Sequence, residues 1–148
     1  MGVVMIDSFS GDFRFLSNFV GSVTTPKGTF CATVEHAFQA AKTLDPGEQK
    51  SVLSCSTPGQ AKRAGRKVTL RRNWDQVKNN VMMALVRAKF TQDSVLAAQL
   101  LATGTEPLVE GNRWHDNYWG SCTCSRCGDA GKNRLGQILM QVRSELPR

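Results

Sequence analysis

The run Glu35-His36-Ala37-Phe38-Gln39-Ala40-Ala41-Lys42 brings together side chain types that could perform acid–base and nucleophilic chemistry. If the run is helical, Glu35, Gln39 and Lys42 share one face, because they stand at positions i, i+4 and i+7. There a carboxylate could move protons, an amide could orient a ligand, and a partly desolvated amine could attack an electrophilic carbon. The same spacing is also typical of an exposed, solvated helix face, so the triplet needs support from the rest of the chain.

The helix that would present this triplet has its own start and stop signals. Thr33 is a suitable N-cap, which puts Glu35 in the first turn, where a negative charge is favoured. We expect the helix to run from Thr33 to Lys42 or Leu44 and to stop at Asp45-Pro46-Gly47.

A second group of reactive side chains lies in the C-terminal third, where Cys122, Cys124 and Cys127 follow one another closely. Thiolates are zinc ligands, and His115 could supply a fourth ligand. The spacing is incomplete as a zinc signature, because no second Cys-x-x-Cys pair accompanies it. Three interpretations therefore stay open: a structural zinc site, redox-sensitive thiols, and free cysteines in a polar loop.

The rest of the chain predicts a mainly α fold of the α+β type, with about five or more helices and a small N-terminal β element. The alternation of Phe13 and Phe15 with polar neighbours favours a short strand or extended segment. Pro26-Lys27-Gly28 favours a hairpin, or a turn between short strands, in residues 22–30. Further helices are predicted from a cap signal at Thr57-Pro58, from apolar spacing between Trp74 and Ala88, over residues 94–103, and from Leu135 to Leu146.

The 148 residues predict one domain, which is long enough to bury a hydrophobic core without stabilising disulfide bonds or metal ions. No apolar run approaches the ~20 residues that cross a bilayer, and the N-terminus has no basic region and no cleavage-site pattern. We therefore expect a cytoplasmic protein without a membrane partner. The formal net charge of +7 suits a phosphate-bearing partner, whether nucleotide or nucleic acid. The sequence does not indicate an oligomeric state.

Motifs along the whole chain carry a resemblance to a known family. The N-terminal motifs are Phe9-x-Gly11-x-Phe13-x-Phe15-Leu16-Ser17-Asn18-Phe19 and Val34-Glu35-His36-x-Phe38-Gln39-Ala40-x-Lys42. The central motifs are Ala61-Lys62-x-x-Gly65-Arg66, Trp74-x-x-x-Lys78-x-x-x-Met82 and Lys89-Phe90. The C-terminal motifs are Leu108-Val109-Glu110, Asp116-Asn117-x-Trp119-Gly120 and Gly131-x-Asn133-x-Leu135-Gly136-x-x-Leu139-Met140. In this order and spacing, the chain resembles the YbiA-like, or NADAR, family over nearly its whole length.

The resemblance implies an N-glycosidase built as one YbiA-like domain over residues 1–148. Family members are associated with two activities. One cleaves early ribosylamino-pyrimidine phosphate intermediates of riboflavin synthesis to ribose 5-phosphate and a base. The other removes ADP-ribose from guanine bases in nucleosides or nucleic acid. The motifs do not choose between these substrates, but the basic charge favours the larger polyanion, ADP-ribosylated nucleic acid.

Both activities break a bond between ribose C1 and an exocyclic nitrogen. Such a glycosylamine can open to an imine, which the Lys42 amine could attack to form a Schiff base. Glu35 would then handle the proton and Gln39 would position the substrate, and the resemblance points to the same lysine and glutamate as the reacting pair. The alternative is direct hydrolysis, in which Glu35 or Asp116 stabilises an oxocarbenium-like state or activates water. Neither route requires a cofactor.

Other polar and aromatic residues are candidates for binding the substrate, because amides bind hydroxyls, aromatic rings stack on bases, and basic groups or helix N-termini bind phosphate. The candidates are Asn18 for the sugar, Trp119 and Trp114 for the base, and Arg66, Lys62, Arg14 and the predicted N-cap Asn133 for phosphate. All of these except Arg14 also have a structural alternative, as a turn, core, cap or solvated residue. We expect His36 to be a structural, hydrogen-bonded histidine and Trp74 to belong to the core.

A different functional class also stays open, namely a non-catalytic module that binds ADP-ribose or nucleic acid through its positive charge. The carboxylate–amine pair favours the enzyme, because a pure binding module would not need Glu35 beside Lys42.

Overall fold

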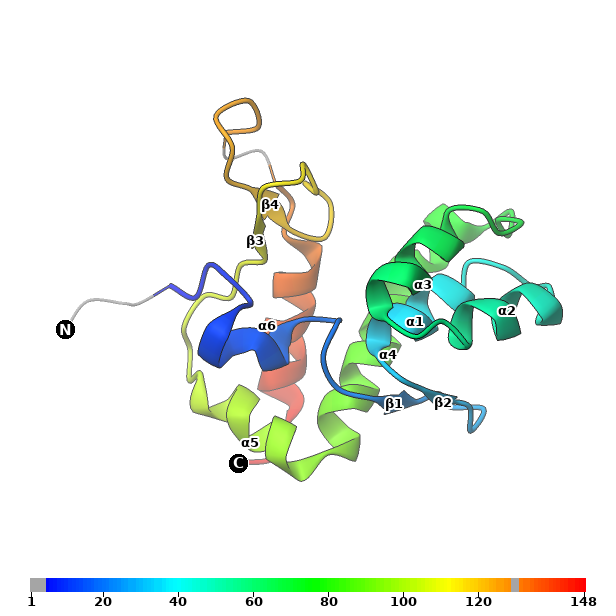
Figure 1. The fold of residues 1–148 in the computed structure, drawn as a ribbon. Helices are drawn as coiled ribbons and strands as arrows, with labels where there is room; N and C mark the ends of the chain where they lie inside the picture. The colour runs from blue at the N-terminus through cyan, green and yellow to red at the C-terminus, as the bar shows by residue number, and fades with distance from the viewer. Residues whose placement is uncertain (1–4, 129–130) are drawn as a thin grey trace. The chain divides into compact units, whose positions relative to one another are not determined.

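The computed structural model describes residues 5–128 and 131–148. The chain divides into two compact units, unit 1 (Met1–Ser17 and Asp93–Arg148) and unit 2 (Asn18–Gln92). Both units are mainly helical (Figure 1), which confirms the predicted fold class. Within the described ranges, none of the helices combines the length and apolar character needed to cross a bilayer.

Unit 2 is built around α1 (Val34–Ala40), a short helix in which every residue is buried. Three helices pack against α1 or lie beside it (Figure 1): α2 (Pro46–Leu53), α3 (Pro58–Gly65) and α4 (Trp74–Gln92). The rings of Phe38 on α1 and Trp74 on α4 are 5.0 Å apart between centroids, and Trp74 is buried, as predicted. Because a helix this short is marginal in isolation, packing against its neighbours stabilises α1.

A small antiparallel hairpin completes unit 2. Strands β1 (Val23–Thr24) and β2 (Phe30–Cys31) pair, with Thr24 opposite Phe30. The turn between them contains Gly28 at φ +86°, a conformation that glycine adopts without steric cost. The predicted hairpin is therefore confirmed.

Unit 1 contains the 3₁₀ helix η1 (Gly11–Leu16), α5 (Ser94–Ala102) and α6 (Arg134–Glu145). Both η1 and α6 contact α5. One side of α6 is apolar and buried, as its spacing predicts. The same unit holds a parallel pair of two-residue strands, β3 (Gly111–Asn112) and β4 (Ser121–Cys122). The sequence did not predict this pair, because strands so short leave no alternating pattern.

The segment around Phe13 and Phe15 was predicted as a short strand or extended segment, and this prediction is wrong. The segment forms η1, in which Phe13 N donates to Ser10 O and Ser17 N donates to Arg14 O. Two alternating aromatic residues are too few to separate a strand from a tight helix. Leu16 rather than the Phe13 side chain is buried here.

The end of the first α-helix was also predicted wrongly. α1 ends at Ala40, so Lys42 lies in the turn that follows it. Asp45-Pro46-Gly47 was predicted to stop a helix, but it also begins the next helix, α2. Asp45 Oδ1 accepts from Gly47 N at 2.8 Å, and Pro46 is the first helical residue. Asp at the N-cap followed by Pro at the first position is a start signal, which accounts for the missed helix.

Candidate active site

The start of α1 is fixed by Thr33 and His36. Thr33 Oγ1 accepts from the His36 backbone N at 3.1 Å, which confirms the predicted N-cap. His36 Nε2 lies 2.9 Å from the carbonyl oxygen of Cys55, and because a carbonyl only accepts, Nε2 carries the hydrogen. Nδ1 then accepts from the Thr33 hydroxyl at 2.8 Å. The fully buried His36 is thus a structural histidine, as expected.

Glu35 and Gln39 are buried, with 7% and 4% of their surfaces exposed, so these two residues do not belong to a solvated helix face. Gln39 Nε2 donates to Glu35 Oε1 at 2.8 Å across one helical turn. The Glu35 backbone N donates to the Asn18 carbonyl oxygen at 3.1 Å. The carboxylate is therefore held in a defined position at the first turn of α1.

The other end of the Gln39 amide has no such partner. Of the residues that the structure describes, Gln39 has a buried side-chain oxygen, Oε1, without a hydrogen bond. The bond from Nε2 to a carboxylate fixes which end is the oxygen. A Cβ on Gly65 of α3 would overlap this side chain, so only glycine allows α3 to approach so closely. A buried acceptor without a protein partner calls for a physical explanation, and a bound ligand or an ordered water would supply one.

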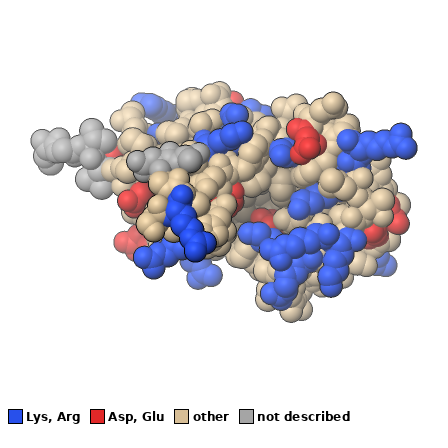
Figure 2. Space-filling model, turned by 90° about the horizontal axis from the view of Figure 1, so that it is seen from above, with Lys and Arg blue, Asp and Glu red and all other residues tan. Residues whose placement is uncertain are grey.

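Lys42 is half-buried, and its environment lowers the pKa of its amine. Burial is the largest cause, because it disfavours the charged form. The negative charge of Glu35 raises the pKa, and the cations Arg66, Lys62 and Lys78 lower it. The net direction favours a neutral, nucleophilic amine. Lys and Arg are also widespread on the face of the molecule shown in Figure 2.

Asn18, the predicted sugar-binding residue, lies beside the same turn of α1. Its side-chain Nδ2 lies 3.4 Å from Met82 Sδ on α4, and the residue is 8% exposed. Thioether sulfur is a weak acceptor, so this contact would yield readily to a hydroxyl. Unit 2 therefore brings together six of the predicted site residues: Asn18, Glu35, Gln39, Lys42, Lys62 and Arg66.

The remaining predicted residues lie in unit 1. Asp116 Oδ1 accepts from the backbone N of Tyr118 at 3.1 Å and of Trp119 at 3.0 Å, so the carboxylate shapes a turn. Trp119 is half-buried and meets the Tyr118 ring edge-on at 4.8 Å. Trp114 and Arg14 are exposed. A role for these four residues in catalysis or binding stays a prediction.

Asn133 stands at the start of α6, but its side chain does not cap the helix. Its Nδ2 donates to Leu108 O at 2.9 Å, and its Oδ1 accepts from Glu110 N at 3.0 Å. The backbone amides of Arg134 and Leu135 donate to the carbonyl oxygens of residues 118 and 119. These two amides are therefore engaged within the protein, which gives no support to a phosphate site there, and a role for Asn133 in binding stays a prediction. Asn133 instead holds the segment before β3 against the start of α6.

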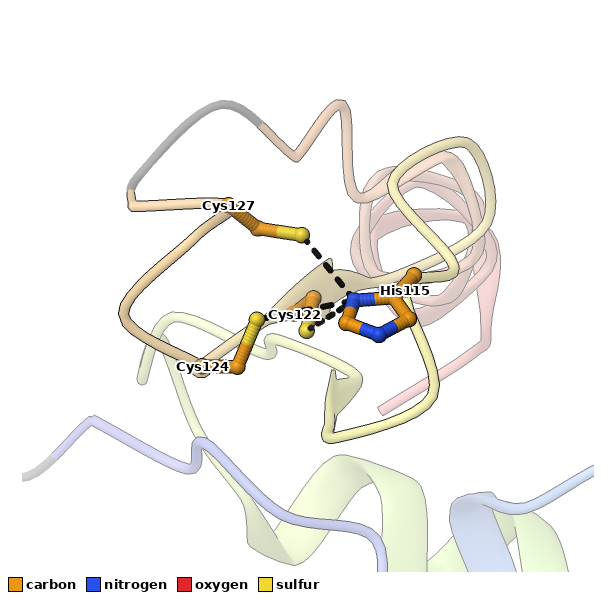
Figure 3. Close-up of side chains that lie close together, drawn as sticks. All are labelled: His115, Cys122, Cys124 and Cys127. Atoms are coloured by element: carbon orange, nitrogen blue, oxygen red, sulfur yellow. Dashed lines mark hydrogen bonds between the residues drawn. The ribbon is translucent and has the colours of Figure 1, made fainter.

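The four residues of the predicted metal set come together in unit 1 (Figure 3). Their ligand atoms all lie within 4.8 Å of one another, close enough to hold a metal ion. His115 Nδ1 is 3.3 Å from Cys127 Sγ, 3.5 Å from Cys124 Sγ and 3.7 Å from Cys122 Sγ. Hydrogen bonds lower the pKa of Cys124 to about 6, first from the Cys127 backbone and then from the Cys122 side chain.

Sequence reasoning missed one residue of unit 2 with unusual chemistry. Lys89 on α4 is 1% exposed, and burial lowers the pKa of its amine to about 7. Its Nζ lies 5.1 Å from the centre of the Phe90 ring. A signal was available, because Lys89 follows the buried Met82 and Leu85 by seven and four positions and so shares their face.

Replacing Lys89 by methionine should flatten the pH dependence of stability. The unfolded lysine has a pKa of about 10.4, whereas the folded one has a pKa of about 7. Between these values the unfolded chain binds more protons, so the free energy of unfolding of the wild type should rise with pH, by up to roughly 1.4 kcal/mol per pH unit. Urea unfolding at several pH values from 7 to 10 measures the slope. The exposed Lys50→Met is the control, and an equal slope in all three proteins would refute the prediction.

Comparisons with known proteins agree with this architecture. The model of the NADAR domain matches residues 8–147. N-glycosidase YbiA of Escherichia coli strain K12 is 40% identical over 146 residues, which is 97% of this chain and 88% of that protein. A riboflavin biosynthesis protein of Vibrio vulnificus is 41% identical over 135 residues, covering 89% of this chain but 35% of that protein.

The fold agrees as well. The NMR structure of Escherichia coli YbiA superposes with a TM-score of 0.80 at 39% identity, covering 97% of this chain and 87% of that one. Family model, sequence and structure thus lead to one assignment. The chain belongs to the NADAR family of YbiA-like N-glycosidases.

Proposed function

We propose that this N-glycosidase releases ADP-ribose from guanine bases, in nucleosides or nucleic acid, through a Schiff base on Lys42. One observation carries the proposal: burial lowers the pKa of the Lys42 amine, and the buried Glu35 carboxylate is near enough to act on that pKa. A neutral amine beside a proton carrier is what attack on an imine carbon requires.

The reaction would proceed in balanced steps. The ribose ring of the substrate opens, so that C1 becomes an imine carbon bonded to the exocyclic nitrogen of the base. The Lys42 amine adds to C1 and loses a proton. The exocyclic nitrogen takes up a proton and leaves as the free amine of guanine, which leaves C1 bound to Lys42 as an imine. Water then hydrolyses this imine, the sugar closes again, and the free Lys42 amine is restored.

Glu35 and Gln39 have separate parts in this scheme. Glu35 would take the proton from Lys42 and deliver it to the leaving nitrogen, since the two residues already interact electrostatically. Gln39 is anchored to Glu35 through Nε2 and has Oε1 without a partner, so it would accept a hydrogen bond from the substrate. No cofactor enters the scheme.

The choice of ADP-ribose rests on charge. Arg66, Lys62 and Lys78 all lie close enough to Lys42 to lower its pKa, and three cations suit a pyrophosphate better than a single phosphate. The formal net charge of +7 also favours a nucleic acid partner. Asn18 would bind sugar hydroxyls. We keep Trp119 and Trp114 as candidates for stacking on a base, and Asp116 as a second carboxylate.

The second candidate substrate is a ribosylamino-pyrimidine phosphate of riboflavin synthesis. It is favoured by the similarity to the riboflavin biosynthesis protein of Vibrio vulnificus. The bond broken is of the same type, so the same residues would serve.

Offering both substrate classes to the purified protein tests the proposal. We expect release of ADP-ribose from an ADP-ribosylated guanine oligonucleotide, with kcat/KM at least about tenfold above that for the ribosylamino-pyrimidine phosphate, a difference of roughly 1.4 kcal/mol in the transition state. Chromatography of the released sugar phosphates measures both. The opposite ranking would assign the protein to the riboflavin intermediate. Binding without turnover of either substrate would instead favour the non-catalytic module.

A further inference from the structure

We propose that His115, Cys122, Cys124 and Cys127 form a structural zinc site, a property independent of the proposed reaction. Zinc binds thiolate sulfur at about 2.3 Å and imidazole nitrogen at about 2.0–2.1 Å, with tetrahedral geometry. Those bond lengths require N–S edges of about 3.6 Å around the metal. The three distances from His115 Nδ1 to the sulfur atoms are 3.3, 3.5 and 3.7 Å, which match these edges, and all four ligand atoms lie within 4.8 Å of one another.

Hydrogen bonding alone does not account for this arrangement. A neutral imidazole nitrogen either donates or accepts, and it has one hydrogen or one lone pair for the purpose. His115 Nδ1 instead faces three sulfur atoms at once (Figure 3). A disulfide would use two of the three cysteines and would leave the third, and His115, without a role. One cation bound by all four atoms satisfies every contact.

The backbone around the cysteines also fits a metal site. The Cys127 backbone N donates to the Cys124 carbonyl oxygen at 3.3 Å, which closes a turn between these two cysteines. Asn117 Oδ1 also accepts from Cys122 N at 2.9 Å. Such outer contacts orient the ligands of a metal site.

His115 provides a further observation, because its backbone is in the left-handed region at φ +67°. A residue other than glycine pays of order 1–3 kcal/mol for such a conformation and keeps it only where the surroundings hold it. The backbone on either side of His115 is held by Asn112, whose Oδ1 accepts from Trp114 N at 3.2 Å and from Asp116 N at 3.1 Å. The exposed His115 side chain is thereby presented to the three sulfur atoms, and a metal bond from Nδ1 would fix it there.

The metal would link the loop between β3 and β4 to strand β4 and to the segment that follows it. His115 lies between β3 and β4, Cys122 lies in β4, and the other two cysteines follow β4. The segment between the strands also carries Asp116 and Trp119. A metal bound here therefore fixes the loop in which these two residues lie. Three thiolates and one neutral imidazole also select a soft divalent ion such as zinc over magnesium or calcium.

Metal analysis of the protein purified under reducing conditions tests the proposal without any measurement of turnover. We expect about one zinc ion per chain, and loss of that zinc in Cys124→Ser and in His115→Ala. The matched control is Cys55→Ser, because Cys55 lies in unit 2 outside the cluster and should leave the zinc content unchanged. Replacing the metal with Co²⁺ should give the thiolate-to-metal absorption bands of a tetrahedral site.

Wild-type measurements keep the test decisive even if a ligand variant does not fold. Treating the wild type with a strong chelator should release the zinc and make further thiols reactive toward a thiol reagent, with loss of amide protection around residues 111–128. A wild type that contains little metal and takes up none when zinc is added would overturn the proposal. A disulfide within the cluster, found by mass spectrometry, would do the same in favour of redox-sensitive thiols.

Discussion

Lys42→Ala should abolish turnover, with kcat lowered by at least about 10³-fold, as expected when a covalent nucleophile is removed. Burial and neighbouring cations lower the pKa of this amine, which gives it a larger neutral fraction than a solvated lysine. Adding borohydride during turnover should trap a covalent adduct of substrate sugar and wild-type protein. The adduct should be absent from Lys42→Ala.

Two further variants separate the Schiff base from other roles of this residue. Lys42→Arg keeps the positive charge but cannot form an imine, so it should also be inactive. Lys50→Ala on α2 replaces an exposed lysine and should retain full activity. Turnover that persists in Lys42→Ala would refute the Schiff base and favour direct hydrolysis assisted by a carboxylate.

Glu35→Gln should lower kcat by about 10²- to 10⁴-fold, the range for loss of a general acid or base. The glutamine oxygen can still accept from Gln39 Nε2, so the packing of α1 should survive. The variant also removes the charge that raises the pKa of Lys42. The acidic limb of the pH–rate profile, where Lys42 must lose its proton, should therefore move to lower pH.

The pH profile is the readout that distinguishes a proton carrier from a structural residue, because a merely structural loss would not move the limb. Glu145→Gln, at the exposed end of α6, is the matched control and should change neither kcat nor the profile. An unchanged kcat in Glu35→Gln would remove Glu35 from the mechanism.

The sequence predicted those parts of the fold that depend on a few neighbouring residues. Thr33 caps α1 and Thr57 caps α3 through hydrogen bonds that span three residues. The turn around Gly28 closes a hairpin of the same local kind. The errors arose where one local signal serves two structures. Asp45-Pro46 can end one helix and begin another, and Phe13-x-Phe15 fits either a strand or a 3₁₀ helix.

Within the candidate site, the sequence identified the chemical groups but not their environments. The spacing of Glu35, Gln39 and Lys42 was compatible with a solvated surface as well as with an active site. The structure shows that Glu35 and Gln39 are buried and that the pKa of Lys42 is lowered. Lys89 makes the same point, because the motif containing it was recognised while its burial and its pKa of about 7 were not.

By itself the sequence determined the family, the main helices and the kinds of side chain available, because motif order, caps and apolar spacing are local properties of the chain. Only the tertiary structure decided which of these side chains are desolvated and which of them meet. The pKa of the Lys42 amine is lowered by Arg66, which directly follows α3, and by Lys78 on α4. The ligand atoms of His115 and the three cysteines lie near the ends of β3 and β4, which pair across the fold. Burial and distance across separate elements depend on packing, which no run of neighbouring residues encodes.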